Sequence, residues 1–315
     1  MEELPQTLLA AVRYFSDLTV CHDYLKSIRW PDGKITCQHC GSDRIGEVAT
    51  RRLLRCKDCR KQIYLKHGTI FEDSPLGLNR WFVAVWSVAN CKNGISSHEL
   101  GRALGVTQKT AWFMLHRIRE AMRTGTFEKL KGEVEADETF IGGEARNMHK
   151  SKREKRIKGR GAVGKAIVQG LLERGGEVRC RVAASTEASE LQPEVRRNVE
   201  PDSTLYTDAA LGYRGLDQQY IHQTIDHSIK YAEGAVHTNG IENFWALLKR
   251  TLKGTYVSVA AFHLLRYLDE QSFRFNQRFG NDAERFHAVM LAIVGRRLTY
   301  RLLTAQDDAG FMGIQ

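Results

Sequence analysis

The sequence predicts an α/β fold, in which a mixed sheet with flanking helices follows a cysteine-rich and helical N-terminal region. Two Cys-x-x-Cys pairs lie close to the N-terminus, and helical patterns follow them. Beyond residue 132 the pattern changes to three strands in a row, after which helices and strands alternate. A three-stranded meander that continues into crossover units forms a mixed sheet with helices packed on it.

The chain is basic, with a formal net charge of +10 over 315 residues and a pI near 9.3. Such an excess favours a polyanionic partner, nucleic acid first, although a generally basic surface is the simpler alternative. No apolar run reaches membrane-spanning length, and Glu2 and Glu3 stand where a signal peptide carries basic residues. We therefore expect a cytoplasmic protein with no membrane partner, whose seven cysteines are thiols or metal ligands.

Four of these cysteines predict a zinc ribbon. Cys37 and Cys40 form one Cys-x-x-Cys pair, Cys56 and Cys59 form a second, and fifteen residues separate the two. This spacing is typical of a structural Zn²⁺ site with four thiolate ligands, to which a redox pair or chance spacing are the alternatives. The basic residues around the second pair either offset the thiolate charge or contact DNA phosphates: Arg51, Arg52, Arg55, Lys57, Arg60 and Lys61.

Two short helices joined by a tight turn predict a helix-turn-helix. Ser96 and Glu99 form a capping box that opens the first helix. Gly105 turns the chain, and Thr107 caps the second helix, which runs to about Met122. Five side chains of the second helix are expected to face DNA: Gln108, Lys109, His116, Arg117 and Arg119.

Periodicity predicts the remaining elements. Helices are expected over 5–29, 78–90, 188–199, 259–276 and 282–294, and strands over 133–141, 163–172, 177–184, 204–207 and 219–224. A run rich in lysine and arginine occupies residues 147–161. Charge runs of this kind are usually solvated loops, and such a loop beside a reaction site can become ordered on a DNA backbone.

Three carboxylates predict a site for hard divalent cations. Asp137 lies within the strand 133–141, Asp208 follows the strand 204–207, and Glu242 belongs to a helical segment. If the two strands are neighbours in the sheet, the two aspartates can meet, with the helix packed across that edge. Carboxylates with open cation positions suit two Mg²⁺ ions, which together serve the attacking and leaving oxygens of a phosphoryl transfer.

The helix that carries Glu242 supports this interpretation. Asn239, Glu242 and Lys249 share one helical face, and Lys249 and Arg250 are suited to contact phosphates. Two alternatives for the ligands remain open: the amide oxygen of Asn239 in place of Glu242, and Glu135, on the same strand face as Asp137, as the ligand of the first strand.

Four stretches carry a family resemblance: CQHC…CKDC, VEADETFIGG, YTD and HTNGIENFWALLKR. Over nearly its whole length the chain resembles zinc-ribbon DDE transposases of bacterial insertion sequences, the ISXO-like group. The resemblance implies an RNase H-like catalytic domain with Asp137, Asp208 and Glu242 as its triad. Lys249 would be the basic residue that follows, and the metal would be Mg²⁺ (or Mn²⁺). It further implies binding to terminal inverted repeats and association with the nucleoid of a bacterium.

The sequence therefore predicts a transposase that cleaves DNA strands and joins them to target DNA, acting as a homo-oligomer because two ends must be joined. A DNA-binding regulator without activity and an RNase H-like nuclease without strand transfer are the alternatives. Five regions are expected: a helical segment (1–35), a zinc ribbon (36–72), a helix-turn-helix region (73–130), a catalytic domain (131–300) and a tail (301–315).

Overall fold

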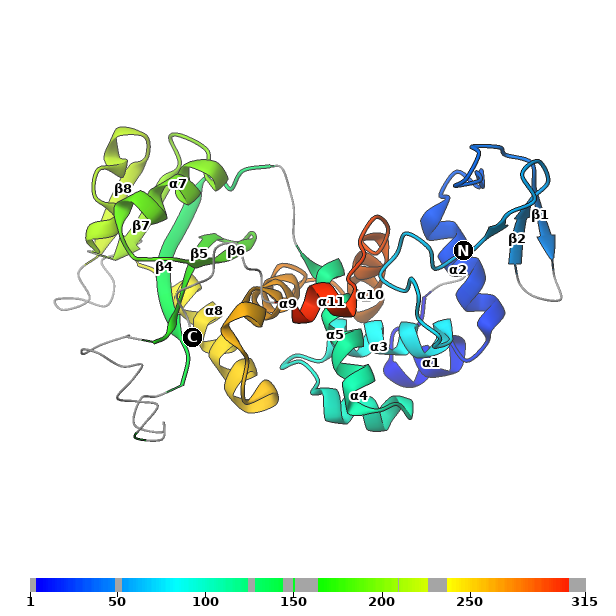
Figure 1. Cartoon of the computed structure of the whole chain (residues 1–315). Helices are drawn as coiled ribbons and strands as arrows, with labels where there is room; N and C mark the ends of the chain where they lie inside the picture. The colour runs from blue at the N-terminus through cyan, green and yellow to red at the C-terminus, as the bar shows by residue number, and fades with distance from the viewer. Residues whose placement is uncertain are drawn as a thin grey trace. The chain divides into compact units, whose positions relative to one another are not determined.

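The computed structural model describes residues 4–48, 53–123, 128–143, 150, 164–208, 210–225 and 237–305 (Figure 1). The chain forms two compact units. The first consists of Met1–Met122 with Phe279–Thr304, and the second of Arg123–Arg278 with Ala305–Gln315. Most of the expected basic run at 147–161 lies outside the described residues.

A small sheet in the first unit holds the cysteines. Strands β1 (Ile45–Val48), β2 (Leu53–Cys56) and β3 (Gln62–Ile63) pair antiparallel in that order. Cys56 ends β2 and Cys59 lies in the turn that follows, while the first pair lies in the loop before β1. This arrangement brings two segments that are distant in the sequence to the same end of a small hairpin.

The helical stretch expected over 5–29 is instead two helices, α1 (Leu8–Tyr14) and α2 (Leu18–Arg29). The carboxylate of Asp17 accepts a hydrogen bond from the backbone N–H of Thr19 at 2.7 Å. That bond starts a new helix, because a side-chain acceptor at this position satisfies a donor that has no partner within the helix.

The expected helix-turn-helix is present as α4 (Ser97–Leu104) and α5 (Gln108–Met122). The capping box of Ser96 and Glu99 forms with both of its hydrogen bonds, and Thr107 accepts from the backbone N–H of Thr110 at 3.2 Å. Gly105 adopts φ 64°, a left-handed conformation that ends α4 without the strain a side chain would cause.

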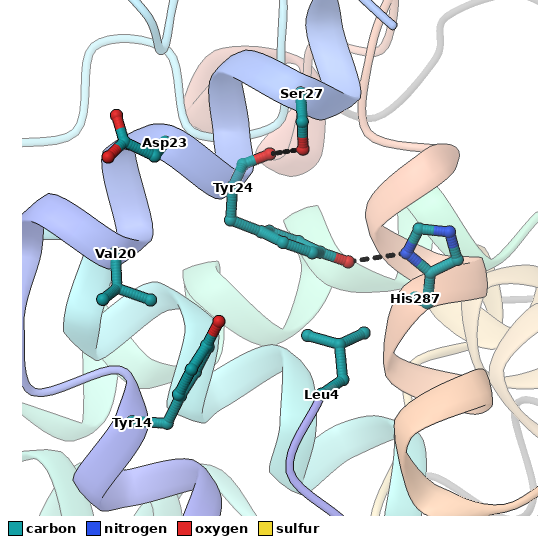
Figure 2. A pocket seen from close by; sticks show the side chains of 7 residues that line it. All are labelled: Leu4, Tyr14, Val20, Asp23, Tyr24, Ser27 and His287. Carbon is teal, nitrogen blue, oxygen red and sulfur yellow. Dashed lines mark hydrogen bonds between the residues drawn. The ribbon is translucent and has the colours of Figure 1, made fainter. Parts of the chain in front are cut away.

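Helices α3 (Leu78–Asn90) and α10 (Asp282–Leu291) pack together at the centre of the first unit. The ring of Phe286 lies 5.5 Å from that of Trp86, centroid to centroid. Helix α2 is connected to α10 by the Tyr24 hydroxyl, which lies 2.7 Å from His287 Nδ1 beside a pocket of about 460 Å³ (Figure 2). The expected catalytic region ran to residue 300, whereas α10 and α11 (Tyr300–Thr304) belong to the first unit.

The second unit contains the predicted mixed sheet. Its five strands stand in the order β6-β5-β4-β7-β8. Strand β4 pairs antiparallel with β5, which pairs antiparallel with β6, while β4–β7 and β7–β8 are parallel. The strands are β4 (Glu133–Ile141), β5 (Ala166–Glu173), β6 (Val178–Ala183), β7 (Thr204–Asp208) and β8 (Ile221–Ile225). The two strands that carry the aspartates are therefore neighbours.

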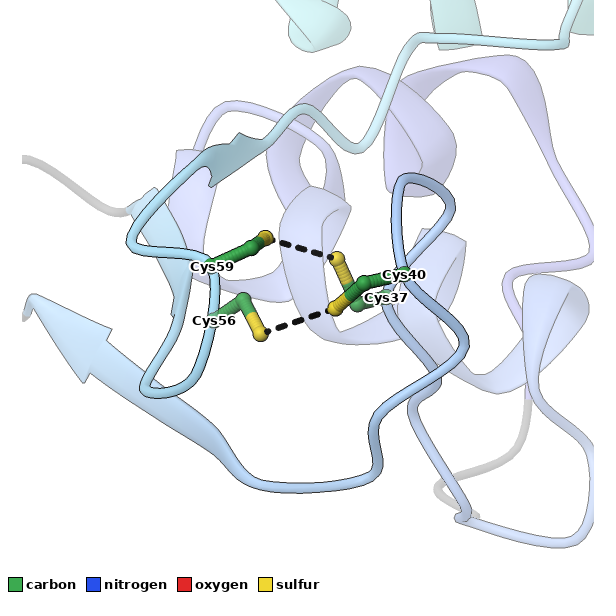
Figure 3. Close-up of side chains that lie close together, drawn as sticks. All are labelled: Cys37, Cys40, Cys56 and Cys59. Atoms are coloured by element: carbon green, nitrogen blue, oxygen red, sulfur yellow. Dashed lines mark hydrogen bonds between the residues drawn. The ribbon is translucent and has the colours of Figure 1, made fainter.

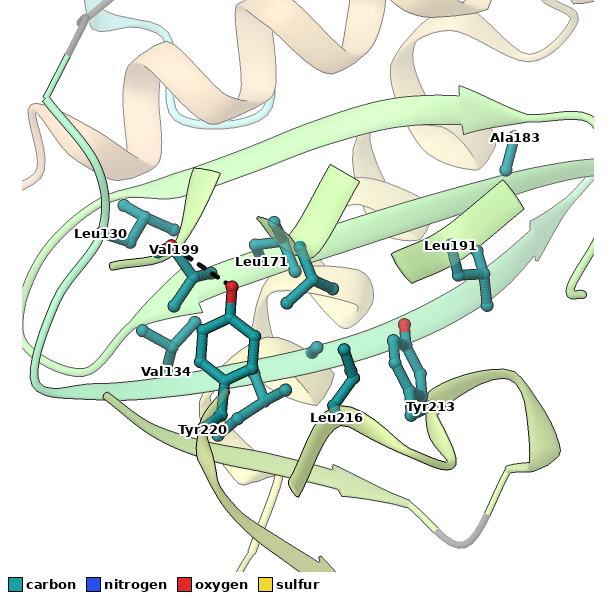
Figure 4. Packing of buried hydrophobic residues seen from close by; sticks show 12 residues of the cluster. Leu130, Val134, Leu171, Ala183, Leu191, Val199, Tyr213, Leu216 and Tyr220 are labelled. Carbon is teal, nitrogen blue, oxygen red and sulfur yellow. Dashed lines mark hydrogen bonds between the residues drawn. The ribbon is translucent and has the colours of Figure 1, made fainter. Parts of the chain in front are cut away.

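Helices cover both faces of this sheet. One face packs with Val134 and Ala136 against α7 (Ala188–Asn198) and two short 3₁₀ turns, which contribute Tyr213 and Leu216 (Figure 4). The opposite face packs against α8 (Asn239–Thr251) and α9 (Leu264–Asn276). Because strand side chains alternate, Glu135 and Asp137 lie on the α8 face.

No helix among the described residues is both long and apolar enough to span a bilayer.

Candidate active site

The register of β4 and β7 brings the two aspartates side by side. Ala136 is paired with Thr207 in a parallel arrangement, and Asp137 and Asp208 are the next residues of the two strands. Neighbouring residues in register on parallel strands project to the same face of the sheet. Both carboxylates therefore lie on the face that α8 covers.

Two hydrogen bonds hold α8 against β4. Glu135 Oε2 accepts from the backbone N–H of Ile241 at 2.8 Å, and Asp137 Oδ2 accepts from Trp245 Nε1 at 2.9 Å. Two residues along a strand and four along a helix both span about 6 to 7 Å. The two contacts are therefore equally far apart on β4 and on α8, and both residue numbers increase together, so strand and helix run in the same direction. Glu242 is the residue after Ile241, which makes the first contact.

Glycines permit this close approach. Gly170 on β5 is paired with Asp137, and a Cβ at that position would lie 2.6 Å from the ring of Trp245. A Cβ on Gly240 would lie 2.8 Å from Glu135 Oε2. Larger residues at either position would push α8 away from the sheet and would separate Glu242 from the aspartates.

Burial first, and neighbouring negative charge second, raise the pKa of two carboxylates on β4. Burial, together with the charges of Asp208 and Glu242, raises the pKa of Asp137 to about 6. Burial also raises the pKa of Glu138 to about 7, with further contributions from Asp137 and Asp208. Glu138 lies on the opposite face of β4, where its carboxylate accepts a hydrogen bond from the Tyr213 hydroxyl. An accumulation of buried carboxylates suits a bound cation.

Glu135, the alternative ligand of the first strand, makes other contacts. Its side chain is 1% exposed, forms an ion pair with Arg174 at 2.8 Å, and caps α8 through Ile241. His237 Nδ1 lies 3.5 Å from the same carboxylate. These contacts give Glu135 a role at the start of α8. The sequence pattern, which identifies the strand face, does not reveal this role.

On α8 itself, the expected polar face is exposed. Asn239, Glu242, Lys249 and Arg250 are all exposed. Glu242 Oε1 accepts a hydrogen bond from the Thr238 hydroxyl at 3.2 Å. The charge of Glu242 is also one of the contributions that raise the pKa of Asp137, after burial and the charge of Asp208.

The four cysteines come together in the first unit (Figure 3). The sulfurs of Cys37 and Cys59 are 3.6 Å apart, as are those of Cys40 and Cys56. A tetrahedron of sulfurs about 2.3 Å from Zn²⁺ has edges of about 3.8 Å, so the spacing suits a structural zinc. Among the described residues, only this group places three or more His, Cys, Asp or Glu ligand atoms within 4.8 Å of one another.

The expected DNA-contacting residues of α5 divide into two groups. Gln108 and Lys109 are exposed at the start of the helix. His116, Arg117 and Arg119 are buried, and the expectation that they face outward was wrong. The physical reason is that α5 packs against α3 and α10, so this polar stretch faces the interior. The guanidinium of Arg117, for example, donates to the backbone carbonyl of Glu72.

Family models match both parts of the chain. A transposase zinc-ribbon domain matches residues 19–62, and an ISXO2-like transposase domain matches residues 129–276. The chain belongs to the ISXO2-like transposase family.

Two curated relatives agree with this. A transposase-like protein of Haemophilus influenzae is 38% identical over 96 residues, which are 30% of this chain and 77% of the relative. A protein in transposable element ISH50 of Halobacterium salinarum is 28% identical over 241 residues, 72% of this chain and 81% of that relative. The match to the transposase domain spans all five strands of the mixed sheet and ends with α9.

Proposed function

We propose that this transposase cleaves DNA strands at the ends of an insertion sequence and joins them to target DNA, with Asp137, Asp208 and Glu242 as its catalytic carboxylates. The observation that carries the proposal is the parallel register of β4 and β7 under α8. This register supports the pairing of Asp137 with Asp208, and the hydrogen bonds of α8 to β4 support the addition of Glu242, which lies on that helix.

The donor set fits a hard divalent cation. All three side chains offer carboxylate oxygens, which Mg²⁺ and Mn²⁺ prefer. Burial, with the charges of Asp208 and Glu242, raises the pKa of Asp137, and a bound cation would favour its ionised form. A pair of such ions would activate a water or 3′ hydroxyl and stabilise the leaving oxygen. Asn239, one turn before Glu242 on the same face, is a further candidate ligand.

The protein's own groups prepare the carboxylates. Trp245 Nε1 donates to one oxygen of Asp137, and the backbone N–H of Ala210 donates to Asp208 Oδ1 at 3.1 Å. Each bond fixes the orientation of one carboxylate. Lys249, two helical turns beyond Glu242, is placed to contact a phosphate of the bound strand.

DNA recognition is assigned to the first unit. The zinc ribbon and the helix pair α4–α5 are expected to bind the terminal inverted repeats, with Gln108 and Lys109 at the exposed start of α5 nearest to the bases. In the second unit, Lys249 and Arg250 would contact DNA phosphates. Two copies of the chain are expected on the DNA, because two ends must be brought together.

The test is strand cleavage and joining on a duplex that carries one end of the insertion sequence, with Mg²⁺ or Mn²⁺. The wild type should nick the element end and join it to a second duplex, and Asp208→Asn should do neither while it still binds the DNA. Equal activity of the two proteins would refute the assignment. Nicked products that are never joined would restrict the activity to hydrolysis.

A further inference from the structure

A hollow of about 690 Å³ lies beside α8 in the second unit, away from the carboxylates. The end of β4 forms one wall with Ile141, and the end of α8 and the following turn form the other. Three lysines line it: Lys165, Lys249 and Lys253. We refer to this hollow as the lysine groove. Neither Lys165 nor Lys253 stood out in the sequence.

Within the described part of the chain, no acidic side chain compensates the charge of the groove. Among the described carboxylates, none forms an ion pair with Lys165, Lys249 or Lys253. Three ammonium groups around one concavity repel one another and create a local positive potential, which an anion would relieve. The groove is therefore suited to an anionic ligand with more than one charge.

Strand β4 and helix α8 both extend from the proposed catalytic carboxylates to the groove. Strand β4 and helix α8 run in the same direction from the carboxylates. Ile141 lies four residues beyond Asp137, about 13 Å along the strand, and Lys249 lies seven residues beyond Glu242, about 10 Å along the helix. Both elements thus lead from the acids into the groove over a similar distance.

That distance corresponds to a few nucleotides. One strand of duplex DNA advances about 3.4 Å along the axis per nucleotide, so 10 to 13 Å corresponds to about three or four. A strand whose phosphodiester is held at the acids would place later phosphates among the three lysines.

One rim of the groove has an unusual backbone. The turn Leu252–Tyr256 continues α8 as a π-helix, and Val257 follows it with φ 61°. A β-branched residue rarely adopts this conformation, and its side chain is 79% exposed at the rim. Such turns and strained residues are frequent at binding sites, where the surrounding structure imposes them. An exposed apolar side chain beside the lysines can pack against a sugar or base.

We propose that the lysine groove binds the phosphodiester backbone of the DNA strand being cut, within about four nucleotides of the scissile phosphate. The inference rests on the proposed function for the identity of that strand. It adds Lys165 and Lys253 as phosphate contacts and Val257 as an apolar contact.

Binding is tested first, without catalysis. In the full chain carrying Asp208→Asn, Lys165→Gln/Lys253→Gln is compared with Lys131→Gln, an exposed lysine at the opposite end of β4. The probe is the duplex with one end of the insertion sequence, and affinity is measured against salt. The plot of log affinity against log salt should become less steep by about two for the double variant, because two phosphate contacts are lost. A slope equal to that of Lys131→Gln would overturn the proposal.

Position is tested by removing charge from the DNA. Uncharged methylphosphonates are placed at successive positions on each side of the scissile phosphate, and cleavage is measured in single turnover. At one or two positions within the expected span, the substitution should slow the wild type and should not slow Lys165→Gln/Lys253→Gln any further. Additive losses at every position, or interference confined to the target duplex, would overturn the assignment to the cut strand.

The binding experiment and the cleavage experiment together distinguish failure of the groove proposal from failure of the proposed function. If the wild type cleaves nothing but the salt dependence changes as expected, the proposed function fails and the groove still binds DNA. If cleavage occurs, the salt dependence of the double variant equals that of Lys131→Gln, and methylphosphonates slow the double variant as much as the wild type, only the groove proposal fails.

Discussion

The cysteine site and the carboxylate site are built in opposite ways. The four cysteines come from 23 positions of the chain, and their sulfurs lie within 4.8 Å of one another. The three proposed catalytic acids come from two strands and a helix, and they are not gathered as tightly. The first site is formed by two local turns, whereas the second depends on the packing of a whole sheet and helix.

The difference corresponds to what each site has to do. A structural zinc needs four fixed ligands and no open position. A site for phosphoryl transfer must leave room for cations, substrate and water, so its ligands stand further apart and are oriented by neighbouring groups. In this chain Glu135, Trp245 and Gly170 provide that support for the carboxylates.

The largest expected effect is the loss of stability when zinc is removed, which should affect the cysteine site and not the carboxylate site. Chelation, or Cys56→Ser, should unfold the β1–β3 sheet, because zinc binding to such small sites contributes about 10 to 16 kcal/mol. Hydrogen exchange should then accelerate in β1–β3 and not in β4–β8. Cys21→Ala, which alters a buried thiol outside the site, should retain zinc. Loss of protection in both sheets together would contradict the independence of the sites.

The support beneath α8 is probed by Glu135→Gln. The change removes a buried charge that pairs with Arg174, and it should lower the stability of the second unit by about 3 kcal/mol. Glu133 also contacts Arg174, at 3.4 Å, but is half exposed, so Glu133→Gln should cost less than about 1 kcal/mol. Urea unfolding, monitored by hydrogen exchange in α8, measures the loss of stability in each of the two variants. Equal losses of stability in Glu135→Gln and Glu133→Gln would show that burial of the ion pair does not determine its contribution to stability.

The orientation of Asp137 is probed by Trp245→Phe, which keeps an aromatic ring and loses the N–H donor. Cleavage should slow about 10- to 100-fold, the usual effect of removing a group that orients a metal ligand. The Mg²⁺ concentration for half-maximal rate should rise while DNA binding stays unchanged. Trp86→Phe, in the core of the first unit, is the control for loss of an indole and should not alter the Mg²⁺ dependence. An unchanged Mg²⁺ dependence in Trp245→Phe would leave Trp245 as a packing residue only.

The smallest effect tests how closely α8 must approach the sheet. Gly170→Ala should destabilise the second unit by about 1 to 3 kcal/mol, because the new methyl group meets the Trp245 ring. A Cβ on Gly143 meets nothing within 4 Å, so Gly143→Ala should leave the thermal midpoint unchanged. If the two alanines behave alike in thermal unfolding, the approach of α8 is looser than the structure indicates.

Much of the architecture was predictable from local patterns. The strand over 133–141 and the two strands that follow it in a meander were expected from their periodicity, and the structure contains them. The capping box at Ser96 was predictable because its two hydrogen bonds involve only residues three apart. The break at Asp17 was missed because the helical periodicity continues across it. The break itself is caused by the Asp17 side chain, which caps the start of α2.

What the sequence by itself determined is local: the cysteine spacing, the caps and turns, and the alternation that assigns Asp137 to one strand face. The depth of α5 and the contacts of α8 were decided only by the tertiary structure. The helical pattern predicts that polar residues such as Arg119 face solvent, whereas Arg119 is buried. Whether a helix lies at the surface depends on how many other elements pack around it. Likewise Glu135 and Asp137 look equivalent along the strand, and only the position of α8 makes one a cap and leaves the other beside Asp208.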